Sequence, residues 1–494
     1  MAGRYQFVEV PPPEVSWVAL GPSGLDDDEG PKVPNRHVGV GERVNRGVAV
    51  LPGGTGAVTA RTDAEGRRIW TVPVMTDDDA EQSATPIRPQ VDPSTVRPEQ
   101  LDEWLKRVAD AGVRPDRVNC PDLVGQLDAT RDKPIEAVLC SCLEPDPLLP
   151  LQYEWAALHP RAFRDGLRLL ASLSGGKFVS VAVAAGRHKQ LGRLLRDAVS
   201  NDRVAEPIAE APREPTEDEQ IDVEPVEVGR IRIVPVLNAY PQGDPVLLTS
   251  TLTGRRLRPG DLPTRAGVLV VDAVAAVAIG QVVRGAGVIR REPIGLRDHR
   301  RDIGVLAEVW KGSRLADVLL FLGMLPGDPE KPGDDATPKS MPKLVAGDFL
   351  RGRTIRPESL VGDGELLFHR LSTSADDLQP TPEPCIRCGW CLDICPTSLN
   401  PAGLLDVEAE RGKTRLALAE RYGAAACIGC GLCDHACPSD LPLKDIALKL
   451  RGELQIAHRF EHDEEHKQRP IARPRGARTI FSVRMPAPKK KPSD

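Results

Sequence analysis

Residues 385–396 read CIRCGWCLDICP, and residues 427–438 read CIGCGLCDHACP. In each run three cysteines are separated by two residues, and a fourth cysteine follows three residues later, directly before a proline. This is the spacing of bacterial ferredoxins, in which the fourth cysteine serves the other cluster. The two runs therefore predict an α-helical dicluster ferredoxin domain, over residues 375–455, that binds two [4Fe–4S] clusters.

The spacing also assigns the ligands, because the proline turns the fourth cysteine of each run away from its own triplet. Gly389, Gly429 and Gly431 would let the backbone approach the inorganic sulfurs and donate N–H groups to them. Structural zinc is the alternative, but zinc ribbons use paired cysteines and not triplets closed by Cys-Pro. The predicted ligands are Cys385, Cys388, Cys391 and Cys437 for the first cluster, and Cys427, Cys430, Cys433 and Cys395 for the second.

The composition of the chain places this domain within a larger protein. At 494 residues several domains are expected, and the net charge of -6 gives no reason to expect a nucleic-acid partner. The longest apolar stretch, residues 267–282, is interrupted by Asp272, and the N-terminus has no secretory pattern. We expect a cytoplasmic protein, in which a disulfide framework is disfavoured.

Four further regions are predicted outside the cysteine domain, and together they indicate a multidomain α/β plus β fold. Residues 35–75 alternate short β-branched runs with Gly and charged turns, which predicts a β module. Residues 100–290 alternate strand-like and helical patterns, which predicts an α/β domain with an acidic insertion at 202–228. A small module is expected at 291–370. The basic tail, 459–494, is either an electrostatic attachment to an anionic surface or a solvated, disordered end.

Local patterns predict particular elements. A helix is expected to begin near Pro98, and further helices over 404–422 and 441–454. Trp390 is interpreted as a packing residue. Three cysteines outside the two runs are interpreted as buried, inert thiols: Cys120, Cys140 and Cys142. The strand-like runs lie at 137–140, 178–185, 231–237 and 267–273.

The chain resembles the RnfC family, a cytoplasmic-side component of the Rnf electron-transport complex. The two cysteine runs and the helical spacer between them carry most of the resemblance, and the segments YPQG (240–243) and LTGR (252–255) add a weaker match. The resemblance covers most of residues 35–455. It implies a barrel-sandwich-like N-terminal module, a Rossmann-like, flavoprotein-like α/β domain and a small β-grasp-like module.

The resemblance also implies a function. The chain would be the electron-transfer iron–sulfur subunit of a membrane-associated oxidoreductase complex, relaying single electrons through its two clusters. Its partners would be the other subunits of that complex and a soluble electron donor such as ferredoxin. Its place would be the inner face of the cell membrane, as a peripheral subunit.

One segment departs from the family. Where the family has a glycine-rich loop, GGAGFPT, residues 111–127 read AGVRPDRVNCPDLVGQL, so Pro115 and Asp116 replace glycines and put negative charge where phosphates would lie. A second signature survives only as Cys-Leu-Glu-Pro at 142–145, in which Glu144 is interpreted as a structural remnant. These changes argue against FMN or NADH binding and independent NADH dehydrogenase activity. An NADH- or flavin-binding subunit and a regulatory or structural iron–sulfur protein remain the alternatives.

Overall fold

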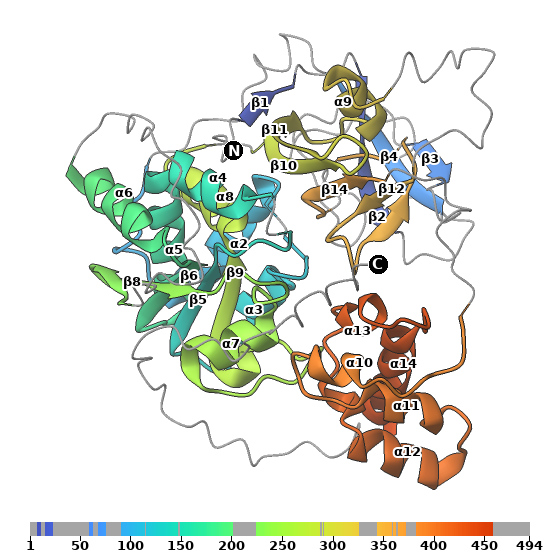
Figure 1. Ribbon diagram of the computed structural model, residues 1–494. Coiled ribbons are helices and arrows are strands. Elements are labelled where there is room, and N and C mark those ends of the chain that lie inside the picture. Colours follow the sequence, from blue (N-terminus) through green and yellow to red (C-terminus); the bar gives the residue numbers. More distant parts are fainter. Residues whose placement is uncertain are drawn as a thin grey trace, which may run out of the picture. The chain divides into compact units, whose positions relative to one another are not determined.

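The structure is a computed structural model whose described residues form two compact units (Figure 1). The first unit comprises the described residues before position 380, except 258–260. The second comprises residues 382–457 together with 258–260. The described residues are 7–10, 15–22, 59–62, 68–75, 90–113, 115–146, 149–200, 224–286, 289, 291–325, 343–357, 359–361, 364–371 and 382–457.

A five-stranded sheet forms the centre of the α/β domain. Its strand order is β7-β8-β6-β5-β9, and all neighbours are parallel except β7, which runs antiparallel to β8. Strands that are covered on both faces read as continuous apolar runs, and every residue of β5 and β9 is buried. The four predicted strand-like runs are confirmed. The strands are β5 (Ala137–Ser141), β6 (Phe178–Ala184), β7 (Val226–Val228), β8 (Ile231–Val236) and β9 (Val268–Asp272).

Helices flank this sheet (Figure 1). The predicted helix near Pro98 is present as a 3-10 turn followed by α2, whose Leu101, Trp104 and Val108 are buried. Strand β7 lies inside the range predicted for the acidic insertion, while residues 202–223 lie outside the described residues. The helical elements are η1 (Pro98–Gln100), α2 (Leu101–Asp110), α3 (Leu123–Ala129), α4 (Leu151–Leu158), α5 (Pro160–Ser174), α6 (His188–Ser200), α7 (Pro245–Thr253), η2 (Pro263–Ala266) and α8 (Ala273–Val283).

Helices α5 and α8 pack closely because each places a glycine at the contact. A Cβ atom on Gly280 would lie 1.7 Å from the carbonyl oxygen of Ala162, and one on Gly166 would lie 1.9 Å from that of Ala276. Only glycine permits backbones to approach this closely. The two glycines therefore set the distance between the helices that cover β5 and β9.

A six-stranded mixed sheet forms the small module, in the order β1-β11-β10-β14-β12-β13. Its core contains Ile294, Leu296, Val309 and Phe368. The N-terminal strand β1 pairs in parallel with β11, a pairing that the sequence did not reveal. The elements are β1 (Phe7–Glu9), β10 (Arg291–Asp298), β11 (Ile303–Trp310), α9 (Leu315–Phe321), β12 (Leu344–Ala346), β13 (Arg353–Ile355) and β14 (Leu367–Arg370).

A separate three-stranded antiparallel sheet comprises β2 (Val15–Pro22), β4 (Arg68–Met75) and β3 (Thr59–Thr62) in that order. It contains the end of the β module predicted at 35–75, and β2 adds residues that precede that range. Residues 35–58 and the predicted basic tail, 459–494, lie outside the described residues.

The second unit is helical and internally repeated. Each cysteine run leads through a one-turn helix, α10 or α13, into a longer helix, α11 or α14. The helix expected over 404–422 is present as two helices that bracket a break at residues 408–411, and the helix expected over 441–454 is α14. The elements are α10 (Trp390–Asp393), α11 (Pro401–Val407), α12 (Gly412–Arg421), η5 (Ala424–Ala426), α13 (Leu432–His435) and α14 (Leu443–Ala457).

Candidate functional site

The backbone of each cysteine run turns through left-handed conformations. Gly389, with φ 83°, precedes α10, and Gly431, with φ 79°, precedes α13 at the equivalent position. Two residues earlier, Arg387 and Gly429 also have positive φ, 58° and 69°. Glycine adopts this conformation without a steric cost, whereas arginine does not. The repeated turns coil each triplet of cysteines around a common centre.

The eight cysteines of the runs line two separate cavities, each enclosing a similar empty space, about 340 and 320 Å³. In both cases three cysteines of one run are joined by the last cysteine of the other. The structure thus brings together the sets that the spacing predicts. Cys385, Cys388, Cys391 and Cys437 line the first cavity, and Cys395, Cys427, Cys430 and Cys433 line the second.

The chain turns sharply after each Cys-Pro step. Ser398 and Asp440, at equivalent positions, have φ values of 57° and 52°. Asn400 then caps α11, because its side-chain oxygen accepts a hydrogen bond of 2.8 Å from the Gly403 N–H. After this turn and cap the chain continues as α11, while Cys395 lines a cavity together with cysteines of the second run.

Burial affects the thiols of both sets. It raises the pKa of Cys391, Cys427 and Cys433 above the ordinary value of a thiol. The protein without metal therefore holds these groups as neutral thiols at neutral pH. Iron would bind the thiolates, so metal binding would release protons from the same side chains. Among the described residues no three His, Cys, Asp or Glu side chains form a group that could hold one metal ion.

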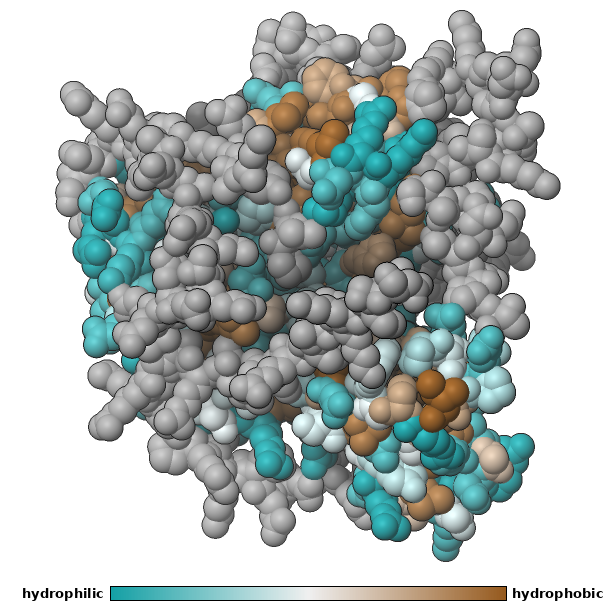
Figure 2. All heavy atoms as spheres, viewed as in Figure 1, coloured by the Kyte–Doolittle hydropathy of each residue, from teal (hydrophilic) through white to brown (hydrophobic). Residues whose placement is uncertain are grey.

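The two cavities differ in their exposure. Around the first, Cys388 is exposed, and Ile386, Trp390 and Leu392 are 66%, 52% and 40% exposed. Around the second, Cys427 and Cys430 are both buried. Trp390, which was interpreted as a packing residue and not as an electron relay, leaves half of its surface open to solvent and packs only in part. Figure 2 shows apolar side chains on part of the surface of this unit.

A buried arginine joins the helices of the second unit. Arg415 on α12 donates hydrogen bonds of 2.7 and 2.9 Å to the carboxylate of Glu453 on α14. It also donates to the backbone carbonyls of Val407 and Glu408, at the end of α11. One side chain thus holds three helices together around the cysteine loops.

The carboxyl edge of the parallel sheet is the second place where a ligand could bind, because ligands of open α/β sheets lie there. At the end of β9, Asp272 is fully buried and bonds the Arg117 guanidinium through two contacts, one of them 2.9 Å from Nη2 to Oδ1. Asp272 also accepts a hydrogen bond of 2.8 Å from the Ala275 N–H and so caps α8. The N-terminus of α8 is therefore occupied by the protein's own charges.

A second arginine lies over the same edge. Arg351, from the loop between β12 and β13, pairs with Asp244 at 2.9 Å and with Asp348 at 2.7 Å. Asp244 in turn caps α7 by accepting a hydrogen bond from the Val246 N–H. None of these charged residues was predicted from the sequence as part of a group with Arg117 and Asp272. The one signal in the sequence was that Arg117 lies within residues 111–127, the segment that differs from the family's glycine-rich loop.

The remaining predicted residues of this region lie in the interior. Glu144 is buried, its Oε1 accepts a hydrogen bond of 3.0 Å from the Tyr153 N–H on α4, and burial raises its pKa to about 8. Burial also raises the pKa of the Cys120 and Cys140 thiols. Cys142 is buried as well. The predicted burial of the three cysteines is confirmed, and Glu144 contributes to the start of α4.

These features define a class: an iron–sulfur protein with a ferredoxin-type dicluster unit and an α/β domain. Two family models match the chain. One is described as a 4Fe-4S dicluster domain and covers residues 382–441, and the other is described as the Nuo51 FMN-binding domain and covers residues 124–281. The second match begins after Pro115, Asp116 and Arg117.

The relatives confirm the resemblance to the RnfC family. The chain is 27% identical over 181 residues to the subunit designated C of the proton-translocating ferredoxin:NAD(+) oxidoreductase complex of Clostridium ljungdahlii, covering 35% of this chain and only 36% of that protein. It is 23% identical over 357 residues to the equivalent subunit of the Na(+)-translocating complex of Acetobacterium woodii, covering 71% and 69%. Cobalamin reductase PduS of Citrobacter freundii is 26% identical over 268 residues, covering 49% and 55%.

Among solved structures, the air-oxidised NAD+-reducing [NiFe]-hydrogenase is a distant likeness, with a TM-score of 0.39 and 16% identity over 72% of this chain and 64% of that chain. No helix in the part of the chain that the structure describes has the length and apolar character needed to cross a bilayer.

Proposed function

We propose that the second unit holds two [4Fe–4S] clusters and that the chain is the electron-transfer subunit of a membrane-associated, Rnf-like oxidoreductase complex. The observation that carries the proposal is the grouping of the eight cysteines into two cavities of four, each completed by the other run. Clusters bound there would accept and release single electrons. The first would be held by Cys385, Cys388, Cys391 and Cys437, and the second by Cys427, Cys430, Cys433 and Cys395.

The chain's own residues fit such clusters in three ways. Four sulfur atoms are available in each cavity, which is the ligand set of a cubane. Gly389 and Gly431, which have left-handed backbone conformations, line the two cavities beside the cysteines. Apolar side chains such as Leu441 and Leu443 pack beside the first set, limiting water there. Zinc fits less well, because zinc sites are built from cysteine pairs and not from an exchanged fourth ligand.

The partners of the chain follow from its relatives, two of which are named as subunits of ferredoxin:NAD(+) oxidoreductase complexes. Other subunits of such a complex are the proposed partners, and ferredoxin is the proposed soluble donor. The chain would then lie on the cytoplasmic side as a peripheral subunit. The exposed side chains beside the first cavity make that end of the unit the proposed site of exchange with a partner.

The paired charges at the edge of the α/β sheet do not fit a flavin phosphate, although the family model of this domain is described as FMN-binding. Arg117 and Asp272 neutralise one another at the N-terminus of α8, where a phosphate would otherwise bind. Arg351, which is paired with two carboxylates, lines a cavity at the same edge of the sheet. We propose that this Rossmann-like domain, with the barrel-sandwich-like and β-grasp-like modules, serves as a scaffold for docking.

The test is anaerobic purification with iron and sulfide analysis, followed by absorbance spectra after NADH and then dithionite. About eight irons per chain, bleached by dithionite and not by NADH, would support two relay clusters without a nucleotide site. An iron content of about one atom for each set of four cysteines, or zinc in place of iron, would refute the two clusters. Variants with Cys388→Ser and Cys430→Ser should each lose about half of the iron, and Cys120→Ser should lose none.

The match to an FMN-binding domain favours a second candidate, a flavin- or NADH-binding dehydrogenase subunit. Bleaching of the clusters by NADH, or flavin that co-purifies in stoichiometric amount, would establish it and overturn the scaffold proposal. A regulatory iron–sulfur protein is the third candidate: cluster reduction would then change partner binding without supporting turnover.

A further inference from the structure

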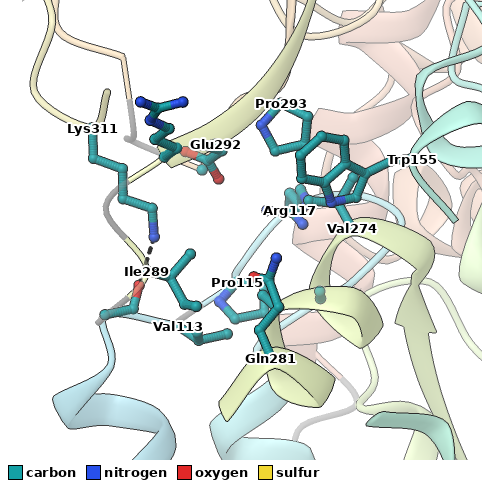
Figure 3. Close-up of a pocket in the computed structure, with 15 residues that line it drawn as sticks. Val113, Pro115, Arg117, Trp155, Val274, Gln281, Ile289, Glu292, Pro293 and Lys311 are labelled. Atoms are coloured by element: carbon teal, nitrogen blue, oxygen red, sulfur yellow. Dashed lines mark hydrogen bonds between the residues drawn. The ribbon is translucent and has the colours of Figure 1, made fainter. Parts of the chain in front are cut away.

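A cavity in the first unit lies apart from the cysteines, where α8 and the loop before α3 face β10 and β11 (Figure 3). Its empty space is about 660 Å³, part of it open to solvent. Val113, Pro115, Trp155 and Pro293 give it apolar walls. Ligand sites commonly combine such walls with a few polar groups at the boundary between two modules.

Glu292, at the start of β10, contributes a carboxylate to this cavity. The residue is only 9% exposed, and its Oε2 atom is buried without a hydrogen-bond partner among the described residues. Buried carboxylates are almost always paired or hydrogen-bonded, because losing water without a replacement is costly. An unpartnered acidic oxygen beside a cavity therefore indicates a missing donor.

Lys311, just after β11, contributes the opposite charge. Its Nζ donates a hydrogen bond of 2.8 Å to the carbonyl of Gly112, which uses one of the three donors of an ammonium group. Burial lowers the pKa of this lysine, and the nearby Glu292 carboxylate opposes the shift. Within the described structure Lys311 and Glu292 line the same cavity without forming an ion pair with one another.

The other charged groups of the cavity are already compensated. Arg117 is paired with Asp272, and Arg291 is paired with Glu9 at the rim. Lys311 and Glu292, which attract one another but form no salt bridge in the described structure, are therefore the charged groups left to a ligand. Gln281, whose amide can donate and accept, also lines the cavity (Figure 3).

We infer that this cavity binds a small zwitterion of the α-amino-acid class. The ligand's carboxylate accepts hydrogen bonds from Lys311, its ammonium group donates to Glu292, and a short apolar side chain lies against Trp155 and Pro293. A ligand of this kind is neutral overall and satisfies both buried charges at once. A simple anion would contact only Lys311, and a simple cation only Glu292.

The test measures the binding of L-valine to the full chain by isothermal titration calorimetry, with glycine, L-alanine and L-leucine as further probes. L-Valinamide lacks the carboxylate, and isovalerate lacks the ammonium group. Each is expected to bind at least about tenfold more weakly than L-valine, because a hydrogen bond to a charged group is lost. The inference is overturned if none of the four amino acids binds at millimolar concentration, or if either analogue binds as well as L-valine.

Variants test the two poles separately. Glu292→Gln and Lys311→Met should each weaken L-valine binding at least about tenfold, while Glu227→Gln and Lys177→Met, on exposed positions, should not change it. Unchanged binding in both pocket variants would refute the inference. If a variant fails to fold, the analogue series on the unaltered chain still decides.

Discussion

Replacing Arg117 with methionine should destabilise the α/β domain strongly. The Asp272 side chain is 0% exposed and Arg117 is 11% exposed, so the change leaves a buried carboxylate without its cation. Breaking a buried pair from one side costs about 3–5 kcal/mol. The loop before α3 would lose its attachment to the end of β9 in the same step.

Hydrogen–deuterium exchange with mass spectrometry measures this loss domain by domain, which suits a chain with more than one folding unit. Since about 1.4 kcal/mol corresponds to a tenfold change, amides of β5 and β9 should exchange roughly a hundred to several thousand times faster in Arg117→Met. Amides of α14, in the second unit, should be unchanged.

A second substitution separates the charge from the packing. In the double variant Arg117→Met with Asp272→Asn, neither residue of the pair carries a charge, and asparagine can still accept from the Ala275 N–H to cap α8. We expect it to recover to within about 1–2 kcal/mol of the unaltered chain. Arg131→Met, which breaks a pair with the exposed Asp102, is the control and should cost less than about 1 kcal/mol. A cost below about 1 kcal/mol for Arg117→Met, or no recovery in the double variant, would refute the buried-pair argument.

Three further predictions concern single residues. In the folded protein, burial raises the pKa of Glu144 to about 8. Its contribution to stability is therefore fully present below about pH 4.5, the pKa of an ordinary glutamate, and is lost as the pH rises toward 8. In Glu144→Gln, the difference between the Tm at pH 5 and the Tm at pH 8 should consequently be smaller than in the unaltered chain. In the metal-free protein, iodoacetamide followed by peptide mass spectrometry should label the exposed Cys388 before the buried Cys427, and the opposite order would contradict the described exposure. Gly280→Ala forces a methyl group against a backbone carbonyl and should lower the free energy of unfolding, measured by denaturant titration, by at least about 2 kcal/mol. Gly452→Ala is the control: the added methyl group meets open space on α14, and the free energy of unfolding should stay the same or rise by up to about 1 kcal/mol.

Much of the local structure could be predicted from the sequence because it depends on neighbours along the chain. The apolar run at 267–273 predicts β9, since a strand covered on both faces needs apolar residues throughout. The periodicity of Leu101, Trp104 and Val108 predicts α2 for the same kind of reason. The cysteine sets could be predicted because the fourth cysteine has a stereochemical cause, the following proline, for leaving its own triplet.

Contacts between distant single residues could not be predicted. Arg117 and Asp272 lie 155 positions apart, and nothing in either neighbourhood indicates the other. Strand β1 has only three residues, too few to show the alternation that predicts a strand, and its partner β11 lies near the middle of the chain. The exposure of Trp390 depends equally on what the rest of the unit covers. Such features require the fold itself.

Whether a buried charged group has a partner within the chain helps to distinguish residues that stabilise the fold from residues that could bind a ligand. At the edge of the parallel sheet, Arg117 and Arg351 meet carboxylates of the chain, so a charged ligand would have to displace satisfied partners. The cysteines of the two runs and Glu292 instead line cavities. Because an unsatisfied buried group is costly, its survival needs a compensating partner. The pairing of Arg117 and Arg351 therefore argues against a flavin phosphate beside these two arginines.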